Sequence, residues 1–113
     1  MSTKNMLAEL DGVMQARKTA APDSSYVASL LHKGEDAILK KVAEEAAEVI
    51  MASKDLAQNQ QDTLHLVKEV ADLWFHTSVL LAYHGLSSED VMAELARREH
   101  TSGLVEKAAR AND

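Results

Sequence analysis

Hydrophobic residues recur at intervals of three and four along most of the chain, the spacing of one face of an α-helix. Polar stretches and single glycine or proline residues interrupt this pattern. We therefore expect helices over residues 3–18, 26–31, 35–54, 63–84 and 88–100, followed by a helical or frayed tail over residues 101–113.

The boundaries of these helices are marked by turn-forming residues. Pro22 breaks the chain after the first helix, and the polar sequence QNQQD (58–62) separates the two long helices. Gly34 and Gly85 are expected to end the second and fourth helices, because glycine readily adopts the backbone conformation of a helix C-terminus. Side-chain caps are expected from Ser24 or Ser25, and from Ser87 together with Asp90.

The helix expected over residues 35–54 is amphipathic. At 100° per residue, its apolar side chains fall within an arc of about 120° formed by Ile38, Leu39, Val42, Ala46, Val49 and Ile50. A polar flank of about 100° carries Lys41, Glu44, Glu45 and Glu48.

The helix expected over residues 63–84 is apolar around more than half of its circumference. Its polar residues form one stripe about 100° wide, made of His65, Lys68, Glu69, Asp72, His76 and Tyr83. A helix that is apolar on most sides must be covered on most sides. Since a few short helices cannot supply this cover, the pattern predicts a homodimer, with Trp74 in the core or at the dimer interface.

Composition favours an all-α fold. The chain has 4% aromatic residues, four glycines and one proline, and it is rich in alanine, which favours helices over strands. Its length of 113 residues, 46% of them hydrophobic, is that of one domain. We expect a single domain over residues 1–113, built as a bundle of four to five helices.

Charge and cysteine content exclude several classes of function. A net charge of −6 argues against binding to nucleic acid, which requires a basic face. The absence of cysteine excludes disulfides and thiolate catalysis. No apolar run approaches the roughly 18 residues of a membrane span, and MSTKNM at the start lacks the apolar core of a signal peptide. These observations predict a cytoplasmic protein that does not associate with membranes.

Two acidic pairs are the candidates for chemistry. The first pair is Glu45 with Glu48, and the second is Glu69 with Asp72. The two acids of each pair are three positions apart on one of the long helices. If these helices pack antiparallel, the four carboxylates converge, and their mutual repulsion favours a divalent cation between them. Ligands that are all oxygen favour Mg²⁺, with Mn²⁺ as a substitute.

These acids have two other interpretations. A single EExxE sequence on a helix is typical of a solvated face, but burying uncompensated carboxylates on the polar stripe of an otherwise apolar helix is costly. A di-iron carboxylate bundle requires Glu-x-x-His on two helices. No glutamate in this sequence is followed by histidine three residues later, so the di-iron interpretation fails.

Three segments of the chain carry a family resemblance, namely SYVASLLHKGEDAILKKVAEEAAEVI (25–50), KEVADLWFH (68–76) and ARREHTSGLVEKAAR (96–110). They resemble the phosphoribosyl-ATP pyrophosphatase family of histidine biosynthesis. That family belongs to the MazG-like all-α nucleotide pyrophosphatase superfamily. The superfamily motif EExxE followed by ExxD is present as Glu44, Glu45, Glu48, Glu69 and Asp72.

The resemblance implies Mg²⁺-dependent hydrolysis of 1-(5-phosphoribosyl)-ATP between its α and β phosphates. It also implies that Glu45, Glu48, Glu69 and Asp72 are the metal ligands. Glu44 and Glu45 are the catalytic candidates, and Glu44 is expected to orient the attacking water or to complete the metal shell.

The small-molecule nucleotide substrate requires cationic or hydrogen-bonding partners. Lys41 lies one turn before Glu45, where it either pairs with that acid or contacts a phosphate. Arg97 and Arg98 are suited to the additional phosphoribosyl group, although a solvated helix end is an alternative. The complete set of expected substrate-binding residues is Ser25, Tyr26, Lys33, Lys40, Lys41, Arg97 and Arg98.

The two histidines of the polar stripe lie four residues from an acid, His65 before Glu69 and His76 after Asp72. We expect each to be a hydrogen-bonding neighbour of that acid rather than a metal ligand. Two further functions remain open from the sequence. One is a housecleaning pyrophosphatase acting on other nucleoside triphosphates, and the other is a non-enzymatic helical dimerisation module.

Overall fold

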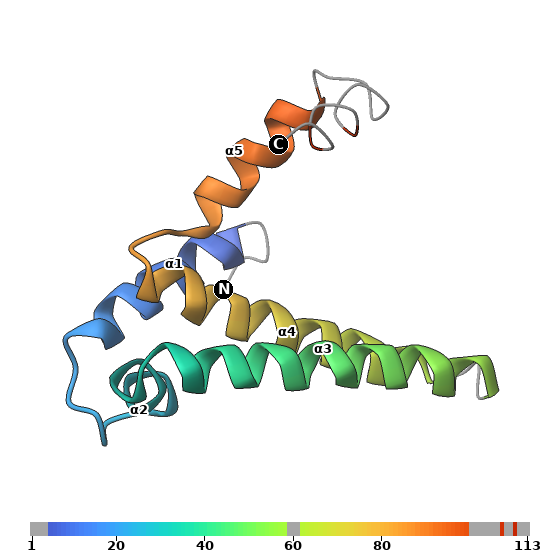
Figure 1. Cartoon of the computed structure of the whole chain (residues 1–113), viewed down its shortest axis with the longest axis horizontal. Helices are drawn as coiled ribbons and strands as arrows, with labels where there is room; N and C mark the ends of the chain where they lie inside the picture. Colours follow the sequence, from blue (N-terminus) through green and yellow to red (C-terminus); the bar gives the residue numbers. More distant parts are fainter. Residues whose placement is uncertain (1–4, 59–61, 100–106, 108–109, 111–113) are drawn as a thin grey trace.

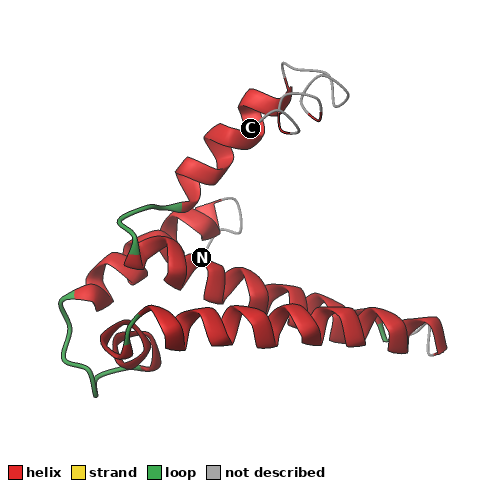
Figure 2. Cartoon of the chain, viewed as in Figure 1, coloured by secondary structure: helices red, strands yellow, loops and turns green. Residues whose placement is uncertain are grey.

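The computed structural model describes residues 5–58, 62–99, 107 and 110, and every element in this part of the chain is a helix. The predicted all-α fold is confirmed (Figure 2). The elements in order are α1 (Met6–Lys18), α2 (Tyr26–Lys33), α3 (Glu35–Gln58), α4 (Thr63–Tyr83) and α5 (Ser88–Glu99). Most of the expected tail over residues 101–113 lies outside the described residues, as do residues 3 and 4 of the first predicted helix.

The predicted C-terminal ends agree with the structure to within one residue except at two helices: α2 continues to Lys33, past the expected end at Leu31, and α3 is also longer than expected. This helix continues to Gln58, past the expected end near residue 54, because residues 55–58 (DLAQ) include no helix breaker. Gly34 and Gly85 both have positive φ, at 101° and 74°. The N–H of Gly85 donates to the carbonyl of Ala82, and that of Leu86 to the carbonyl of Leu81, which forms a Schellman motif after α4.

The predicted caps form, with one addition. The Ser25 hydroxyl accepts a hydrogen bond from the N–H of Ala28 (3.0 Å) and starts α2. Before α5, the N–H of Ser87 donates to the Asp90 carboxylate (2.9 Å), which is the reciprocal bond of a capping box. The addition is Asp11 of α1, which accepts hydrogen bonds from the N–H (3.0 Å) and hydroxyl of Ser88.

The two long helices form the frame of the molecule. α3 and α4 run side by side and antiparallel along most of their length (Figure 1). α2 crosses the first turns of α3, and α1 packs against α2 and α4 at the same end (Figure 1). α5 contacts α1 and then diverges from the α3–α4 pair (Figure 1).

The core is concentrated at the end of the α3–α4 pair that α1 and α2 cover. We call this the covered end. Met14, Ile38 and Val79 are at most 1% exposed there, and they come from α1, α3 and α4 respectively. The cluster is completed by Val27, Leu30 and Ala82, with Leu10, Leu31, Ala37, Phe75 and Leu80 packed around it. Burial of these side chains fixes the relative positions of the first four helices.

The other half of the α3–α4 pair, residues 46–58 and 62–74, extends beyond α1 and α2 except at its inner end, where Trp74 and Leu7 of α1 line one cleft; we call it the projecting half (Figure 1). Large apolar side chains are exposed there, namely Ile50, Met51, Leu64, Val67 and Trp74. α5 likewise exposes Val91, Met92 and Leu95. Trp74 is 57% exposed, so it is not part of the core of this chain. Among the described residues, no helix is both long and apolar enough to cross a membrane.

Candidate metal centre and active site

Three carboxylates from the two long helices converge near the middle of the α3–α4 pair. Glu69 and Asp72 lie about one turn apart on α4, and Glu45 faces them from α3. One oxygen from each residue can be chosen so that all three lie within 4.8 Å of one another. The spacing of the acids and the antiparallel packing of the helices therefore bring together three of the four carboxylates that the sequence predicts to converge.

The fourth predicted ligand lies outside this group. Glu48 is exposed on α3, one turn after Glu45, and among the described residues it is not part of the three-acid group. An exposed glutamate can change rotamer at little cost, so its side chain is free to turn toward an ion. The role of Glu48 as a ligand stays a prediction.

The three-acid group has the donor chemistry of a divalent-cation site. The side chains of Glu45 and Glu69 are only 13% and 17% exposed, so water screens their mutual repulsion only in part. Carboxylate oxygens are the ligands that hard cations prefer, and the group contains no thiolate. A divalent cation therefore fits the residues present.

Lys41 is the cation beside this group. Its ammonium lies 3.2 Å from a Glu44 oxygen and 3.7 Å from a Glu45 oxygen. The hydrogen bond to Glu44 raises the pKa of Lys41, and the electrostatic effects of Tyr26, Glu44 and Glu45 raise it further against the opposing effect of desolvation. Glu44 itself is about half exposed and is held by this lysine at the edge of the site.

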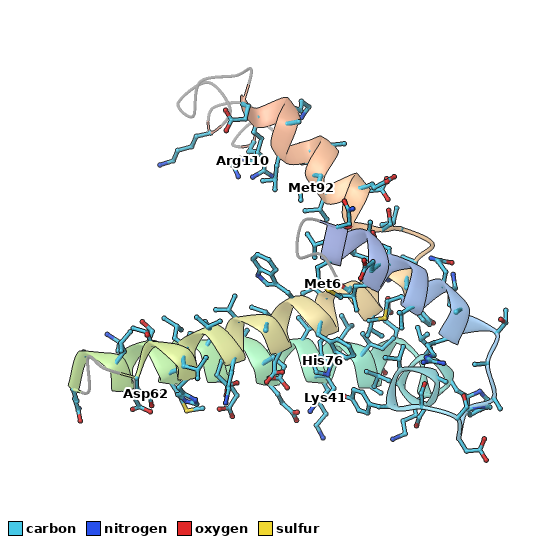
Figure 3. All side chains as sticks on the ribbon, turned by 180° about the vertical axis from the view of Figure 1, so that it is seen from behind. Met6, Lys41, Asp62, His76, Met92 and Arg110 are labelled. Carbon is cyan, nitrogen blue, oxygen red and sulfur yellow. The ribbon has the colours of Figure 1, made fainter. Side chains whose placement is uncertain are left out.

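His76 joins the acidic group to α2. Its ring is buried, and Figure 3 shows it close to Lys41 and far from Asp62 at the tip of the projecting half. The Nδ1 atom lies 2.8 Å from the main-chain carbonyl oxygen of Asp72 and 3.9 Å from a Glu45 oxygen. The Nε2 atom lies 2.8 Å from the Tyr26 hydroxyl. His76 is thus a neighbour of Asp72 as expected, but its bond goes to the main chain rather than to the carboxylate.

The contact between Tyr26 and His76 was missed by the sequence analysis. The two residues are 50 positions apart, and no local pattern connects them. The one available signal was that His76 and Tyr26 both belong to the segments that carry the family resemblance. His65, in contrast, lies beside Glu69 as expected, with its Nδ1 atom 3.8 Å from a Glu69 oxygen.

The remaining predicted residues at the covered end have different surroundings. The Ser25 side chain caps α2, so one acceptor position of its hydroxyl is already used by the N–H of Ala28. Lys33 ends α2 and is exposed. Lys40 is also exposed, and it lies about 100° around α3 from Lys41. Their contacts with substrate stay predictions.

The predicted arginines are not brought to the acidic group within this chain. Arg97 and Arg98 lie in the last turn of α5, which diverges from α3 and α4 (Figure 1). The Nε atom of each lies near a Glu94 oxygen, at 2.9 Å for Arg97 and 3.8 Å for Arg98. Their predicted role at the phosphoribosyl group therefore requires another arrangement of α5 or a neighbouring subunit.

Comparison with known families places this geometry in context. The family model described as phosphoribosyl-ATP pyrophosphohydrolase matches residues 7–99, a range that contains all five helices except the first residue of α1. The chain belongs to this family. The acids of the EExxE and ExxD motifs, including the three that converge, all lie within the matched range.

Individual members of the phosphoribosyl-ATP pyrophosphohydrolase family are similar over nearly their whole length. A protein of Chromobacterium violaceum named phosphoribosyl-ATP pyrophosphatase is 67% identical over 108 residues, covering 96% of this chain and 95% of that protein. A protein of the same name from Neisseria meningitidis serogroup B is 60% identical over 106 residues, covering 94% of this chain and 94% of that protein. A third, from Nitrosospira multiformis, is 56% identical over 110 residues, covering 97% of this chain and 87% of that protein.

Proposed function

We propose that this protein hydrolyses 1-(5-phosphoribosyl)-ATP between its α and β phosphates, yielding 1-(5-phosphoribosyl)-AMP and pyrophosphate. This is the second step of histidine biosynthesis. The observation that carries the proposal is the three-acid group on α3 and α4 in a member of the phosphoribosyl-ATP pyrophosphohydrolase family. Similarity to proteins named for this activity, over nearly the full length of both chains, supports the same substrate.

The proposed metal is Mg²⁺, for which Mn²⁺ can substitute. Glu45, Glu69 and Asp72 would hold it, with Glu48 as a further ligand after a change of rotamer. Bound there, the ion would neutralise the phosphate oxygens and orient the triphosphate for attack by water. Without such a counter-ion, an acidic site would repel a substrate that carries about four negative charges.

Other residues around this site are proposed to orient the attacking water and to contact the substrate. Glu44, held at the edge by Lys41, is the proposed group that orients the attacking water. Lys41 is positively charged at neutral pH, as a lysine with the ordinary pKa of 10.5 already is, and its surroundings raise that pKa further; it is therefore suited to contact a phosphate. Ser25, Tyr26, Lys33 and Lys40 are the further substrate contacts proposed near the covered end.

The proposed active unit is a homodimer of a single-domain chain. Exposed apolar residues of α4 and α5 support this, since isolated proteins seldom expose so many large apolar side chains close together. A cleft of about 320 Å³ between these helices and α1, lined by Leu7, Trp74, Leu81, Val91, Met92 and Leu95 among others, would be filled by the second subunit. Since the proposed substrate is formed from ATP, the proposed site of action is the cytoplasm.

The test is the release of pyrophosphate from phosphoribosyl-ATP by the purified protein, with Mg²⁺ and with excess EDTA. We expect release with Mg²⁺ that EDTA abolishes and Mn²⁺ partly restores. A panel of dUTP, dCTP and ATP measured beside it separates a housecleaning enzyme from the proposed one. Equal turnover of the panel would contradict the proposed specificity, and no metal-dependent release from any nucleotide would indicate a non-enzymatic module.

A further inference from the structure

The hydrogen bond between Tyr26 and His76 takes its direction, in the neutral ring, from the other contact that the ring makes. The Nδ1 atom of His76 lies 2.8 Å from the main-chain carbonyl oxygen of Asp72. A carbonyl oxygen only accepts hydrogen bonds, so Nδ1 must carry the proton in this pair. In the neutral ring the proton is therefore absent from Nε2, and this atom is an acceptor.

With the His76 ring neutral, the hydroxyl group of Tyr26 is the donor. Its oxygen lies 2.8 Å from Nε2 of His76, within the range of a hydrogen bond, and His76 is only 6% exposed. Because the phenolic proton is used in this buried contact, the Tyr26 oxygen has only lone pairs left for other partners. Tyr26 is 51% exposed and lies near Lys41, whose pKa it raises, so we expect these lone pairs to be within reach of a ligand.

We propose that His76 is a positioning residue, which holds the Tyr26 hydroxyl as a hydrogen-bond acceptor for an uncharged donor group on the sugar or base of the nucleotide. A phosphate oxygen cannot be this partner, because an ionised phosphate has no proton to donate. Lys41 is already directed to Glu44 and Glu45. Ribose hydroxyls and base N–H groups are the uncharged donors that a nucleotide offers. This inference rests on the proposed function.

The chain also fixes where this contact is made. Tyr26 is the first residue of α2, and the Ser25 cap sets the start of that helix. The tyrosine ring packs against Phe75 and meets the His76 ring edge-on, with ring centres 6.4 Å and 5.7 Å away. Tyr26 is therefore restrained by packing and by the hydrogen bond together, as a preorganised specificity contact requires.

Four variants test the proposal in steady-state assays at saturating Mg²⁺. Tyr26→Phe removes the acceptor, and we expect about a tenfold increase in KM with kcat changed less than about threefold. His76→Asn can still donate to the Asp72 carbonyl but ends short of Tyr26, so we expect the same increase. His76→Gln reaches Tyr26 with its amide oxygen, and its KM should stay within about threefold of wild type. The combined Tyr26→Phe and His76→Asn variant should be no worse than either single variant.

Analogues of the substrate that lack the 2′- or 3′-hydroxyl of the adenosine identify the donor. If Tyr26→Phe no longer raises KM for one analogue, the contact is to the hydroxyl that this analogue lacks. If Tyr26→Phe raises KM for both analogues as it does for the substrate, the contact is to the base or to the second sugar. Tyr83→Phe is the matched control, since Tyr83 also meets a histidine ring edge-on but lies at the C-terminal end of α4; its kinetics should equal those of wild type.

Several results would overturn the proposal. One is an increase in KM of about a hundredfold for the double variant, which would mean that the two single effects add. Another is a larger increase in KM for His76→Gln than for His76→Asn, which would show that His76 acts through its bond to the Asp72 carbonyl and not through Tyr26. If Mg²⁺ raises the Tm of Tyr26→Phe less than it raises the Tm of wild type, the tyrosine contributes to metal binding instead. ¹⁵N NMR of the His76 ring in the Mg²⁺-bound protein supplies a test without turnover. A proton on Nε2, either alone or together with one on Nδ1, would contradict the proposal even in a fully active enzyme. If wild-type protein releases no pyrophosphate but shows the Nδ1 proton, the proposed function fails and the geometry of the pair stands.

Discussion

The two ends of the α3–α4 pair are made from the same two helices but are used differently. At the covered end, Ile38 and Val79 are fully buried beneath α1 and α2. In the projecting half, Ile50 is 63% exposed and Leu64 and Val67 are each 61% exposed, although they are as apolar as the residues of the core. The hydrophobic pattern along the helices is continuous, and only the cover differs.

This difference separates the part that stabilises the chain from the part that is free to bind. Burial at the covered end supplies the free energy of folding, whereas the exposed apolar side chains of the projecting half contribute little to it. Glu45, Glu69 and Asp72 lie where the two regions meet, next to the buried His76. Carboxylates that repel one another are tolerated there because the packed end beside them holds the helices together.

The largest effect is expected from removing the same side chain in the two regions. Ile38→Ala should lower the free energy of unfolding by about 2–5 kcal/mol, because it leaves a cavity in a filled core. Ile50→Ala, on the same helix, should change it by less than about 1 kcal/mol when the chain is monomeric. Urea unfolding of both variants at low protein concentration is the measurement. An equal loss of unfolding free energy in the two variants would show that the projecting half is as well packed as the covered end.

Next in size is the loss of activity when a charge is removed from the acidic site. We expect Asp72→Asn and Glu48→Gln each to lower kcat/KM at least about 10²-fold, or about 2.7 kcal/mol. Asp36→Asn is the control, an exposed acid on the side of α3 opposite Glu45. Mg²⁺ should raise the Tm of wild type more than that of the Asp72 variant. A fully active Glu48→Gln enzyme would show that this acid is not a ligand.

A smaller effect is expected on self-association. In sedimentation equilibrium at micromolar concentration, wild type should behave as a dimer of the 12.3 kDa chain. Trp74→Ala should raise the dimer Kd by about 30-fold or more, since buried aromatic side chains at interfaces commonly contribute about 2 kcal/mol. Tyr83→Ala, also on α4 but at the covered end, is the comparison. A monomeric wild type would leave the apolar surface of the projecting half without the proposed partner.

The arginines of α5 should affect substrate binding without affecting the metal. Replacing Arg97 and Arg98 together by Ala should raise KM for phosphoribosyl-ATP about tenfold and leave the Mg²⁺ concentration for half-maximal activity unchanged. The pair Arg17 and Lys18 occupies the equivalent place in the last turn of α1, so its double alanine variant is a matched control. If KM is unchanged, these arginines belong to a solvated helix end.

The smallest effect concerns pH and Lys41. Its pKa lies above the ordinary value of 10.5, chiefly because of the hydrogen bond to Glu44, so the protonated form favours the folded chain. This contribution is complete below 10.5 and is lost as the pH rises through the folded-state pKa. The stability difference between wild type and Lys41→Met should therefore shrink above that pH in urea unfolding. Lys40→Met controls for removing a charge from α3, and a difference that widens at high pH would contradict the assignment.

Much of the fold was predictable because its signals are local. Gly34 and Gly85 end helices through their own backbone conformations, and Ser25 caps α2 through a residue three positions away. The convergence of the acids needed one further assumption, that the long helices are antiparallel. The connection at residues 59–62 is too short for another arrangement of neighbouring helices.

The parts that could not be predicted depend on contacts between distant residues. Tyr26 and His76 are 50 residues apart, and Asp11 and Ser88 are 77 apart, so neither pair leaves a periodic signal. The amphipathic pattern also gave one arc for α3 in which Ile38 and Ile50 were equivalent. Which of them is buried depends on where α1 and α2 end, and this is a property of the assembled chain.

The contact between Asp11 and Ser88 has a consequence for the order of folding. The α3–α4 hairpin closes through a connection of a few residues, whereas docking α5 onto α1 closes a loop of 77 residues and loses correspondingly more chain entropy. Contacts of such sequence separation form late, after local ones have reduced the conformational freedom of the chain between them. The hairpin that carries the acids is thus expected to be in place first. α1 and α5 would dock later, because both the packing of α1 on α4 and the contact of Asp11 with Ser88 join residues that are far apart in the sequence.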